Sequence, residues 1–272
     1  MNNRRARTLT AVFVFSLTLL LVAVLGHIWE SDALVTDFSR KNLKPCSDYL
    51  FGTDWLGRDM LKRTVAGLSM SIRLGVVTAA SSAVIALVLG TAAAVLGKAA
   101  DMAVSGLIDT MMGIPHMLLL ILISFACGKG FTGVAIGIAL THWPSLARLI
   151  RAEVLQLKAS QYVKISERLG MGRWRIASEH MLPHLVPQFL TGLVLMFPHA
   201  ILHEASITFL GFGLPPEEPA IGIILSESMK YLITGKWWLA VFPGAALVAT
   251  VLIFQGLGQS ISGLLDPGSA HE

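Results

Sequence analysis

Six long apolar stretches are the feature that most restricts how this chain can fold. Each comes close to the roughly 20 apolar residues that a helix needs to cross the hydrocarbon core of a bilayer. The stretches cover residues 9–28, 74–96, 102–126, 131–147, 185–202 and 237–257. Charged residues make up only 14% of the chain and hydrophobic residues 54%, which excludes a soluble domain. The sequence predicts an all-α integral membrane protein with about six transmembrane helices.

The charges between the stretches predict how the helices are oriented. Arg4, Arg5 and Arg7 precede the first stretch, and no small-residue cleavage site follows it. We therefore expect an uncleaved anchor and a cytoplasmic amino terminus. Counting helices then places residues 29–68 outside the cytoplasm, and residues 148–183 and the carboxyl terminus inside. The inner loop is rich in basic residues, as the positive-inside rule expects, so the net charge of +4 reflects topology and predicts no nucleic-acid partner.

A polar and basic segment interrupts the apolar pattern at residues 161–187. It predicts two short amphipathic helices that are broken at Gly170 and stopped at Pro183, because glycine suits a helix end and proline cannot continue a helix interior. Apolar residues recur at helical spacing in both, as Tyr162, Ile165 and Leu169 and then as Trp174, Ala177 and Met181. We expect this segment to dock a cytoplasmic partner.

The chain has no motif with which it could use ATP itself. Residues 90–99 superficially resemble a phosphate-binding loop, but six residues separate the two glycines, and Ala99 stands where a hydroxyl would meet magnesium. No hydrolase, zincin or metal-cluster motif occurs either. We expect a non-enzymatic chain that binds no cofactor, so that any ATP and Mg²⁺ are used by partner subunits.

Three motifs give the chain a family resemblance. They are FGTDWLGRD at residues 51–59, YVKISERLG with HMLP at residues 162–183, and ASITFLGFGLPP at residues 205–216. Together they resemble the inner-membrane permeases of ABC importers in the dipeptide, oligopeptide and nickel family, and the nickel permeases of the C type in particular. One departure is that Lys164, Ile165 and Ser166 stand where the family's cytoplasmic loop usually has Glu-Ala-Ala.

The resemblance implies a type I ABC-importer permease fold in a single domain, residues 1–272, in the bacterial inner membrane. It implies a homologous second permease, two ATP-binding subunits and an extracytoplasmic substrate-binding protein as partners. The loop at residues 148–183 would then couple the pore to the ATPase. The residues expected in that contact are Tyr162, Lys164, Glu167, Gly170, Trp174, His180, Leu182 and Pro183.

The FGTDWLGRD motif leaves two interpretations open. Asp54, Gly57, Arg58 and Asp59 could contact the binding protein or another partner. Alternatively, they could build a structural external loop, in which an aspartate caps a helix or pairs with Arg58 and the glycines allow tight turns.

Histidines are the residues that bear on the substrate. His116, His142, His199 and His203 fall within or beside the apolar stretches, where polar side chains are costly and often functional. His199 and His203 are four residues apart and share a helix face, and Glu204 follows directly. Neutral imidazole suits nickel, so we expect these five residues to line a substrate pathway and His199 and His203 to form a metal site. The alternative is that the histidines pack and hydrogen-bond between helices.

The sequence thus predicts half of the translocation pore of an ATP-driven importer for nickel or a nickel chelate, with di- or oligopeptides as the alternative cargo. A secondary proton-coupled transporter is the alternative from another class, but it would not need the docking segment at residues 161–187. Cys46 and Cys127 lack metal-ligand spacing, and two unpaired thiols are favoured over a disulfide.

Overall fold

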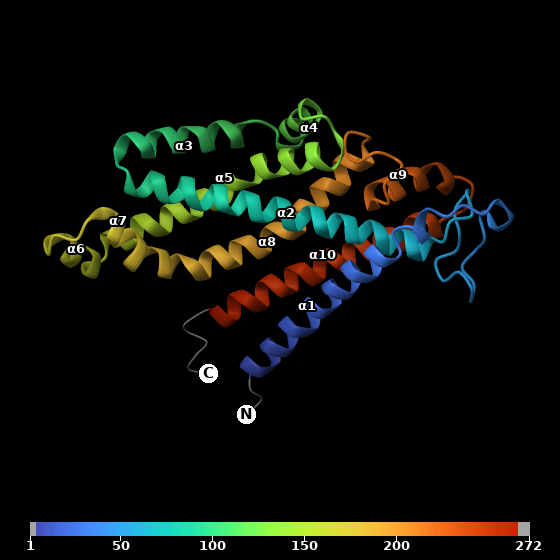
Figure 1. Ribbon diagram of the computed structural model, residues 1–272, viewed down its shortest axis with the longest axis horizontal. Coiled ribbons are helices and arrows are strands. Elements are labelled where there is room, and N and C mark those ends of the chain that lie inside the picture. Colours follow the sequence, from blue (N-terminus) through green and yellow to red (C-terminus); the bar gives the residue numbers. More distant parts are fainter. Residues whose placement is uncertain (1–3, 266–272) are drawn as a thin grey trace.

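The computed structural model describes residues 4–265, and long helices dominate it (Figure 1). Five helical segments are long and apolar enough to cross a membrane, and a sharply bent helix pair supplies a sixth when it is counted as one span. The long helices are α1 (Arg4–Ile28), α2 (Met60–Val95), α5 (Gly130–Ala159), α8 (Leu182–Phe209) and α10 (Trp238–Leu265). The described residues form no β-strand, and the predicted all-α membrane fold is confirmed.

The bent pair consists of α3 (Lys98–Gly113) and α4 (His116–Ala126), whose axes differ by 97°. The span predicted over residues 102–126 is therefore sharply bent and not continuous. Pro115 is the physical reason, because proline disfavours the α conformation in the residue before it. Ile114 is accordingly extended, with φ −87° and ψ 136°, and a new helix starts at His116.

Small residues bring α2 close to α5. Ala83 and Ala86 are fully buried, and a Cβ added to Gly90 would lie only 2.7 Å from the carbonyl oxygen of Ala147 on α5. Glycines do the same between α5 and α4, because a Cβ on Gly133 would lie 2.6 Å from the carbonyl oxygen of Ser124. In a membrane the hydrophobic effect does not drive helices together, because lipid tails are as apolar as the side chains. Close approach of the backbones instead gives the helices van der Waals contact.

Two ion pairs fasten α3 to α5. Asp101 accepts hydrogen bonds from Arg151, with Nη2 2.8 Å from Oδ2, and Asp109 pairs with Arg148 at 2.8 Å. Asp101 borders the third apolar stretch of the sequence, and Asp109 interrupts it. The structure accounts for them, because each one faces a guanidinium on the neighbouring helix.

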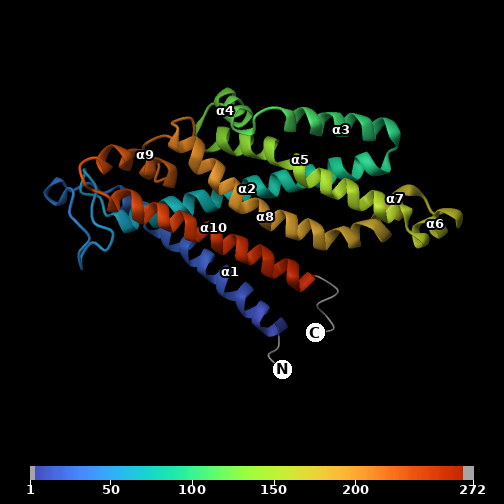
Figure 2. The ribbon, with the colours of Figure 1, turned by 180° about the vertical axis from the view of Figure 1, so that it is seen from behind.

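The two segments predicted to lie on opposite sides of the membrane lie at opposite ends of the molecule (Figures 1 and 2). One end carries α6 (Gln161–Arg168) and α7 (Arg173–Ile176). The other carries α9 (Ile221–Leu232) and the segment between α1 and α2, with its short helices η1 (Asp32–Leu34) and η2 (Phe38–Arg40). The expected cytoplasmic termini, residues 1–3 and 266–272, lie outside the described residues. Cys46 and Cys127 are free and exposed.

The predicted break at Gly170 is confirmed, and Pro183 stands at the start of the next long helix, but the expected interruption before that helix is absent. Gly170 has a φ of 83° and separates α6 from α7. Beyond it, α7 continues through the π-helical turn η3 (Ala177–Met181) directly into α8. Pro183 lies in the first turn of α8, where a missing N–H is tolerated, and the wider turn before it relieves crowding against the proline ring.

Candidate functional site

The helices α6 and α7 present a small apolar surface at one end of the molecule. Ile165, Leu169 and Trp174 are 57%, 79% and 74% exposed. On the opposite face, Val163 and Ile176 are buried in the apolar core that α2, α5 and α8 share. The helices are therefore anchored through one face and leave the other free for a partner.

The structure divides the residues that the sequence assigned to this docking face. Ala177 and Met181 were expected on it, but both are buried in the core, because the π-helical turn continues into α8 and packs with it. His180 is half-buried, and its ring lies 6.0 Å from that of Tyr162. The other predicted coupling residues lie at the surface, namely Tyr162, Lys164, Glu167, Gly170, Trp174, Leu182 and Pro183.

Gly170 closes α6 through its backbone conformation. The N–H of Gly170 donates to the carbonyl of Glu167 at 3.0 Å, and the N–H of Met171 donates to that of Ser166 at 3.1 Å. Such hydrogen bonds satisfy the last carbonyls of a helix and need a left-handed residue at the turn. No described atom lies within 4 Å of a Cβ added there, so the need for glycine is conformational and not a matter of space.

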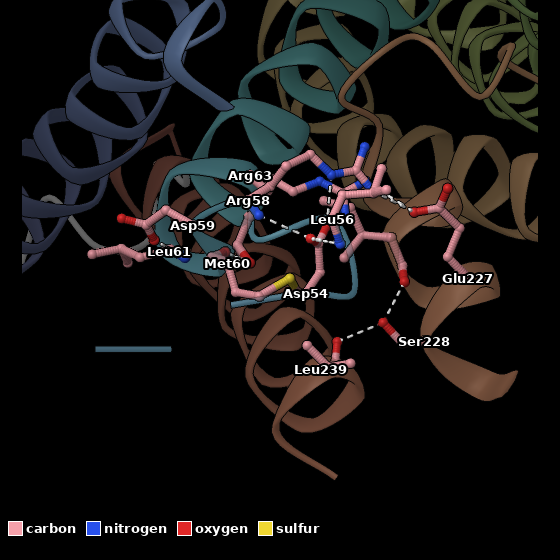
Figure 3. A network of polar contacts seen from close by, with 12 residues as sticks. Asp54, Leu56, Arg58, Asp59, Met60, Leu61, Arg63, Glu227, Ser228 and Leu239 are labelled. Atoms are coloured by element: carbon pink, nitrogen blue, oxygen red, sulfur yellow. Dashed lines mark hydrogen bonds and ion pairs between the residues drawn. The ribbon is translucent and has the colours of Figure 1, made fainter. Parts of the chain in front are cut away.

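At the opposite end, Asp54 is the centre of a buried ion network (Figure 3). Its Oδ2 accepts from Arg58 Nε at 2.6 Å and from Arg63 Nη1 at 2.7 Å. Its Oδ1 accepts from the backbone N–H groups of Leu56 and Arg58 at 2.8 and 2.9 Å. Asp54 is 0% exposed and Arg63 1%, so each charge depends on the others for compensation.

Glu227 of α9 completes the network. Its Oε2 lies 3.0 Å from Arg63 Nη2 and 3.4 Å from Arg58 Nη2. Nearby, Trp55 stacks on Tyr231 of α9 with ring centroids 4.7 Å apart. The FGTDWLGRD segment is thereby fastened to α9, a helix more than 160 residues later in the chain.

This geometry supports the interpretation of the motif as a structural loop. Asp54, Gly57 and Arg58 are buried within the chain's own packing, and Asp59 caps α2 by accepting from the N–H of Leu61 at 2.8 Å. Asp54 and Arg58 are too buried for the expected partner contact, whereas Gly57 and Asp59 line an open pocket at this end of the molecule. Sequence reasoning missed the roles of Arg63 and Glu227, since nothing in the local pattern relates two charges so far apart.

A cavity of about 550 Å³ lies at the bend between α3 and α4, against α5 and α8. All four histidines that the sequence singled out line it, together with Met111, Met112 and Met196. The bend at Pro115 brings the start of α4 to the cavity, and the close glycine contacts hold α4 against α5. The cavity thus combines imidazole and thioether side chains in an otherwise apolar part of the chain.

Three of the four histidines meet in this cavity. The ring centroids are 4.5 Å apart for His116 and His203, 4.8 Å for His116 and His142, and 5.0 Å for His142 and His203. One nitrogen from each lies within 4.8 Å of the others. His199 lines the cavity but is more exposed and lies outside this group. The structure therefore groups His203 with His116 and His142, and not with His199 as in the predicted metal pair.

Glu204 lies apart from the cavity. It is fully buried and accepts hydrogen bonds from Ser71 Oγ at 2.5 Å and Thr208 Oγ1 at 3.0 Å. On α8 it follows His203 directly, and adjacent residues of a helix point in different directions. Its place in the predicted substrate pathway is corrected, since Glu204 joins α8 to α2.

Comparison with known proteins extends these observations. Residues 86–269 match the family described as binding-protein-dependent transport system inner membrane component. The chain is 31% identical over 252 residues to the dipeptide transport system permease protein DppC of Bacillus subtilis (strain 168), covering 92% of this chain and 79% of that protein. It is 30% identical over 260 residues to the probable D,D-dipeptide transport system permease protein DdpC of Escherichia coli (strain K12), covering 96% and 87%.

A solved structure shares the fold. The structure described as inward facing conformations of the MetNI methionine ABC transporter superposes with a TM-score of 0.64 at 19% sequence identity. The match covers 76% of this chain and 98% of that one. At this identity the likeness concerns the arrangement of the helices.

Proposed function

The chain belongs to the family of binding-protein-dependent transport system inner membrane components and is a permease subunit of an ABC importer, and on this premise we propose that its pore carries di- or oligopeptides into the cytoplasm. The similarity to peptide permeases over more than nine-tenths of the chain carries this proposal. The sequence had favoured nickel, but the names of these relatives favour the peptide alternative.

The proposed mechanism is alternating access in a pore shared with a homologous second permease. Two ATPase subunits bind beneath the pair, and an extracytoplasmic binding protein delivers the peptide. ATP binding draws the ATPases together, and α6 and α7 pass that displacement to the membrane helices. The exposed side chains of Leu169 and Trp174 support this role, because they suit a groove on a partner surface.

In this proposal the partner subunits use ATP and Mg²⁺. This chain supplies half of the pore and the surface to which an ATPase subunit docks. The continuous helix from α7 through η3 into α8 offers a direct mechanical route, since α8 also carries His199 and His203 at the cavity. A push on α7 would therefore reach the cavity wall along a single element.

Transport by the complete complex in proteoliposomes tests the proposal. We expect a radiolabelled dipeptide to enter only when ATP, both ATPase subunits and the binding protein are present. Uptake that persists on a proton gradient without the ATPases would instead show the secondary transporter that the sequence left open.

Nickel, free or held by a small chelator, is the second candidate cargo, because three histidines meet in the cavity. The same proteoliposomes given ⁶³Ni²⁺ and dipeptide separately and together distinguish the two. Uptake of ⁶³Ni²⁺ without any uptake of dipeptide would replace the peptide proposal.

A further inference from the structure

Two of the three clustered histidines have hydrogen-bonding capacity that the described part of the chain leaves unused. His116 Nε2 and His142 Nε2 are buried and have no hydrogen-bond partner among the described residues. Buried polar atoms without a partner are costly and uncommon in native proteins. A chain that only needed packing between these helices would be served better by apolar side chains. The unused nitrogens therefore point to a ligand.

The partners of the other ring nitrogens decide which atoms can bind it. His142 Nδ1 lies 3.0 Å from the carbonyl oxygen of Ile138, and His203 Nδ1 lies 3.2 Å from Met117 Sδ. A carbonyl oxygen and a thioether sulfur can only accept, so each Nδ1 carries the proton and each Nε2 has a free lone pair. Metal-binding histidines show this arrangement, with the second ring nitrogen donating to a neighbouring acceptor that fixes the ring.

The spacing of the rings fits a single ion after a small closure. An imidazole nitrogen lies about 2.0–2.1 Å from a bound transition metal, so two such ligands are at most about 4.2 Å apart. One nitrogen of each ring lies within 4.8 Å of the others, and three such ligands around one ion lie about 3–3.6 Å apart, so the rings need to close by about 1–2 Å. They come from α4, α5 and α8, so the site also joins the bend at Pro115 to the two long helices.

We propose that His116, His142 and His203 bind a late first-row transition-metal ion of the Ni²⁺, Cu²⁺ or Zn²⁺ class. Imidazole suits these ions, whereas Mg²⁺ and Ca²⁺ require oxygen ligands. The group contains only histidines among the described residues, so it offers the ion no negative charge. The positive charge of the ion must then be balanced by anionic ligands that enter the cavity with it.

A small peptide can supply those ligands, and this step rests on the proposed function. The amino and carboxylate groups of a peptide both coordinate such ions, and the cavity of about 550 Å³ has the size of a small-molecule site. The ion would enter as a peptide complex and exchange some of its ligands for the three imidazoles. The open side of the cavity would hold the peptide.

Binding of Ni²⁺ to the complete transporter in nanodiscs, measured by equilibrium dialysis with ⁶³Ni²⁺, tests the site. We expect one high-affinity ion per copy of this chain. His116→Ala, His142→Ala or His203→Ala each raises the Kd by at least about tenfold, the loss typical of disturbed metal sites. His27→Ala is the matched control, because this histidine is exposed on α1 and pairs with Glu30. We expect this variant to leave the Kd unchanged.

Two further measurements keep the proposal falsifiable. Where an alanine variant fails to assemble with its partner subunits, glutamine at the same position preserves the volume and removes the ring nitrogens. X-ray absorption of bound Ni²⁺ should show imidazole scattering that weakens in each variant. A wild-type complex that binds no Ni²⁺, or triad variants that bind it as tightly as wild type, would overturn the site.

Transport measurements distinguish a failure of the metal site from a failure of the proposed peptide transport. Dipeptide uptake by a complex that does not bind Ni²⁺ would refute the metal site and leave the peptide importer intact. Ni²⁺ binding at the three histidines without dipeptide uptake would support the metal site and refute the peptide importer. Uptake of ⁶³Ni²⁺ that requires added dipeptide supports entry as a complex, and equal uptake without dipeptide contradicts that step.

Discussion

Arg63 of α2 and Glu227 of α9 form an ion pair of 3.0 Å between residues that are 164 positions apart in the chain. With Asp54 and Arg58 they make a set of two acids and two bases (Figure 3). The pair ties the start of α2 to the helix that precedes α10. This end of the permease is therefore held together by compensation of buried charge.

Asp54→Asn should destabilise the permease strongly. It leaves two buried guanidinium groups with only Glu227 for compensation, and breaking a buried pair in this way costs about 3–5 kcal/mol. Thermal unfolding of the assembled complex in detergent measures the loss. Asp48→Asn is the control, because Asp48 is exposed in the same segment. Equal melting temperatures for the two variants would show that the network carries no stability.

Leu169→Asp should uncouple transport while the chain still inserts and folds. Leu169 is 79% exposed, so the substitution changes folding by less than about 0.5 kcal/mol. In the proposed interface with the ATPase, the substitution places a charge where an apolar side chain is buried. A loss of about 2 kcal/mol in binding free energy corresponds to about thirtyfold weaker binding of the ATPase. Co-purification of the ATPase subunits and peptide-stimulated ATP hydrolysis measure the effect.

Ile233→Asp is the matched control for Leu169→Asp. Ile233 is 94% exposed and follows α9 at the opposite end of the molecule. We expect this variant to retain the ATPase subunits and ATP hydrolysis at the wild-type level. If both substitutions reduce them alike, the effect comes from added charge and not from docking.

Gly170→Val should impair ATP-coupled uptake through strain in the turn between α6 and α7. The φ of 83° disfavours a β-branched residue by about 1–2 kcal/mol, so the turn rearranges and α7 changes direction. Gly172→Val is the control, because Gly172 has no such conformation and a Cβ there also has no described atom within 4 Å. Dipeptide uptake into proteoliposomes compares the two. Loss of uptake in both variants would mean that side-chain bulk, and not the positive φ, is responsible.

Glu218→Gln should stabilise the permease above neutral pH. Burial raises the pKa of Glu218, and the nearby charge of Glu30 raises it further, while Arg73 opposes both. An acid with a raised pKa in the folded state favours unfolding as pH rises past its ordinary value, because the unfolded chain ionises more easily. The wild type should therefore lose stability relative to the variant between acidic pH and pH 8.

Melting temperatures at pH 4 and pH 8 measure this difference. The variant should melt higher than wild type at pH 8, and the gap should narrow at pH 4, where Glu218 is largely protonated. Asp48→Asn is the control, because its side chain is exposed in a different loop. A gap of the same size at both pH values would rule out ionisation of Glu218 as the cause.

Local pattern predicted the features that depend on short segments of chain. Length and hydropathy predict which segments can cross a membrane, because each helix satisfies its own backbone hydrogen bonds wherever its neighbours lie. The turn at Gly170 was predictable for the same reason, since only the backbone of α6 and α7 is involved. The sequence also predicted possible structural roles for Asp54 and Asp59, because helix capping and ion pairing can involve residues that are close together in the chain.

The tertiary structure decided what depends on packing between distant segments. At Pro115 the chain bends sharply, whereas at Pro183 it remains helical. The two prolines differ because the energetic cost of a proline depends on the conformation of the residues around it. The tertiary structure also replaced the pair of His199 and His203 with a group from three helices. Sequence alone thus determined a multi-pass permease with a polar, helix-breaking segment at residues 161–187. Its histidine cluster and its charge network exist only because the folded helices bring remote side chains within contact distance.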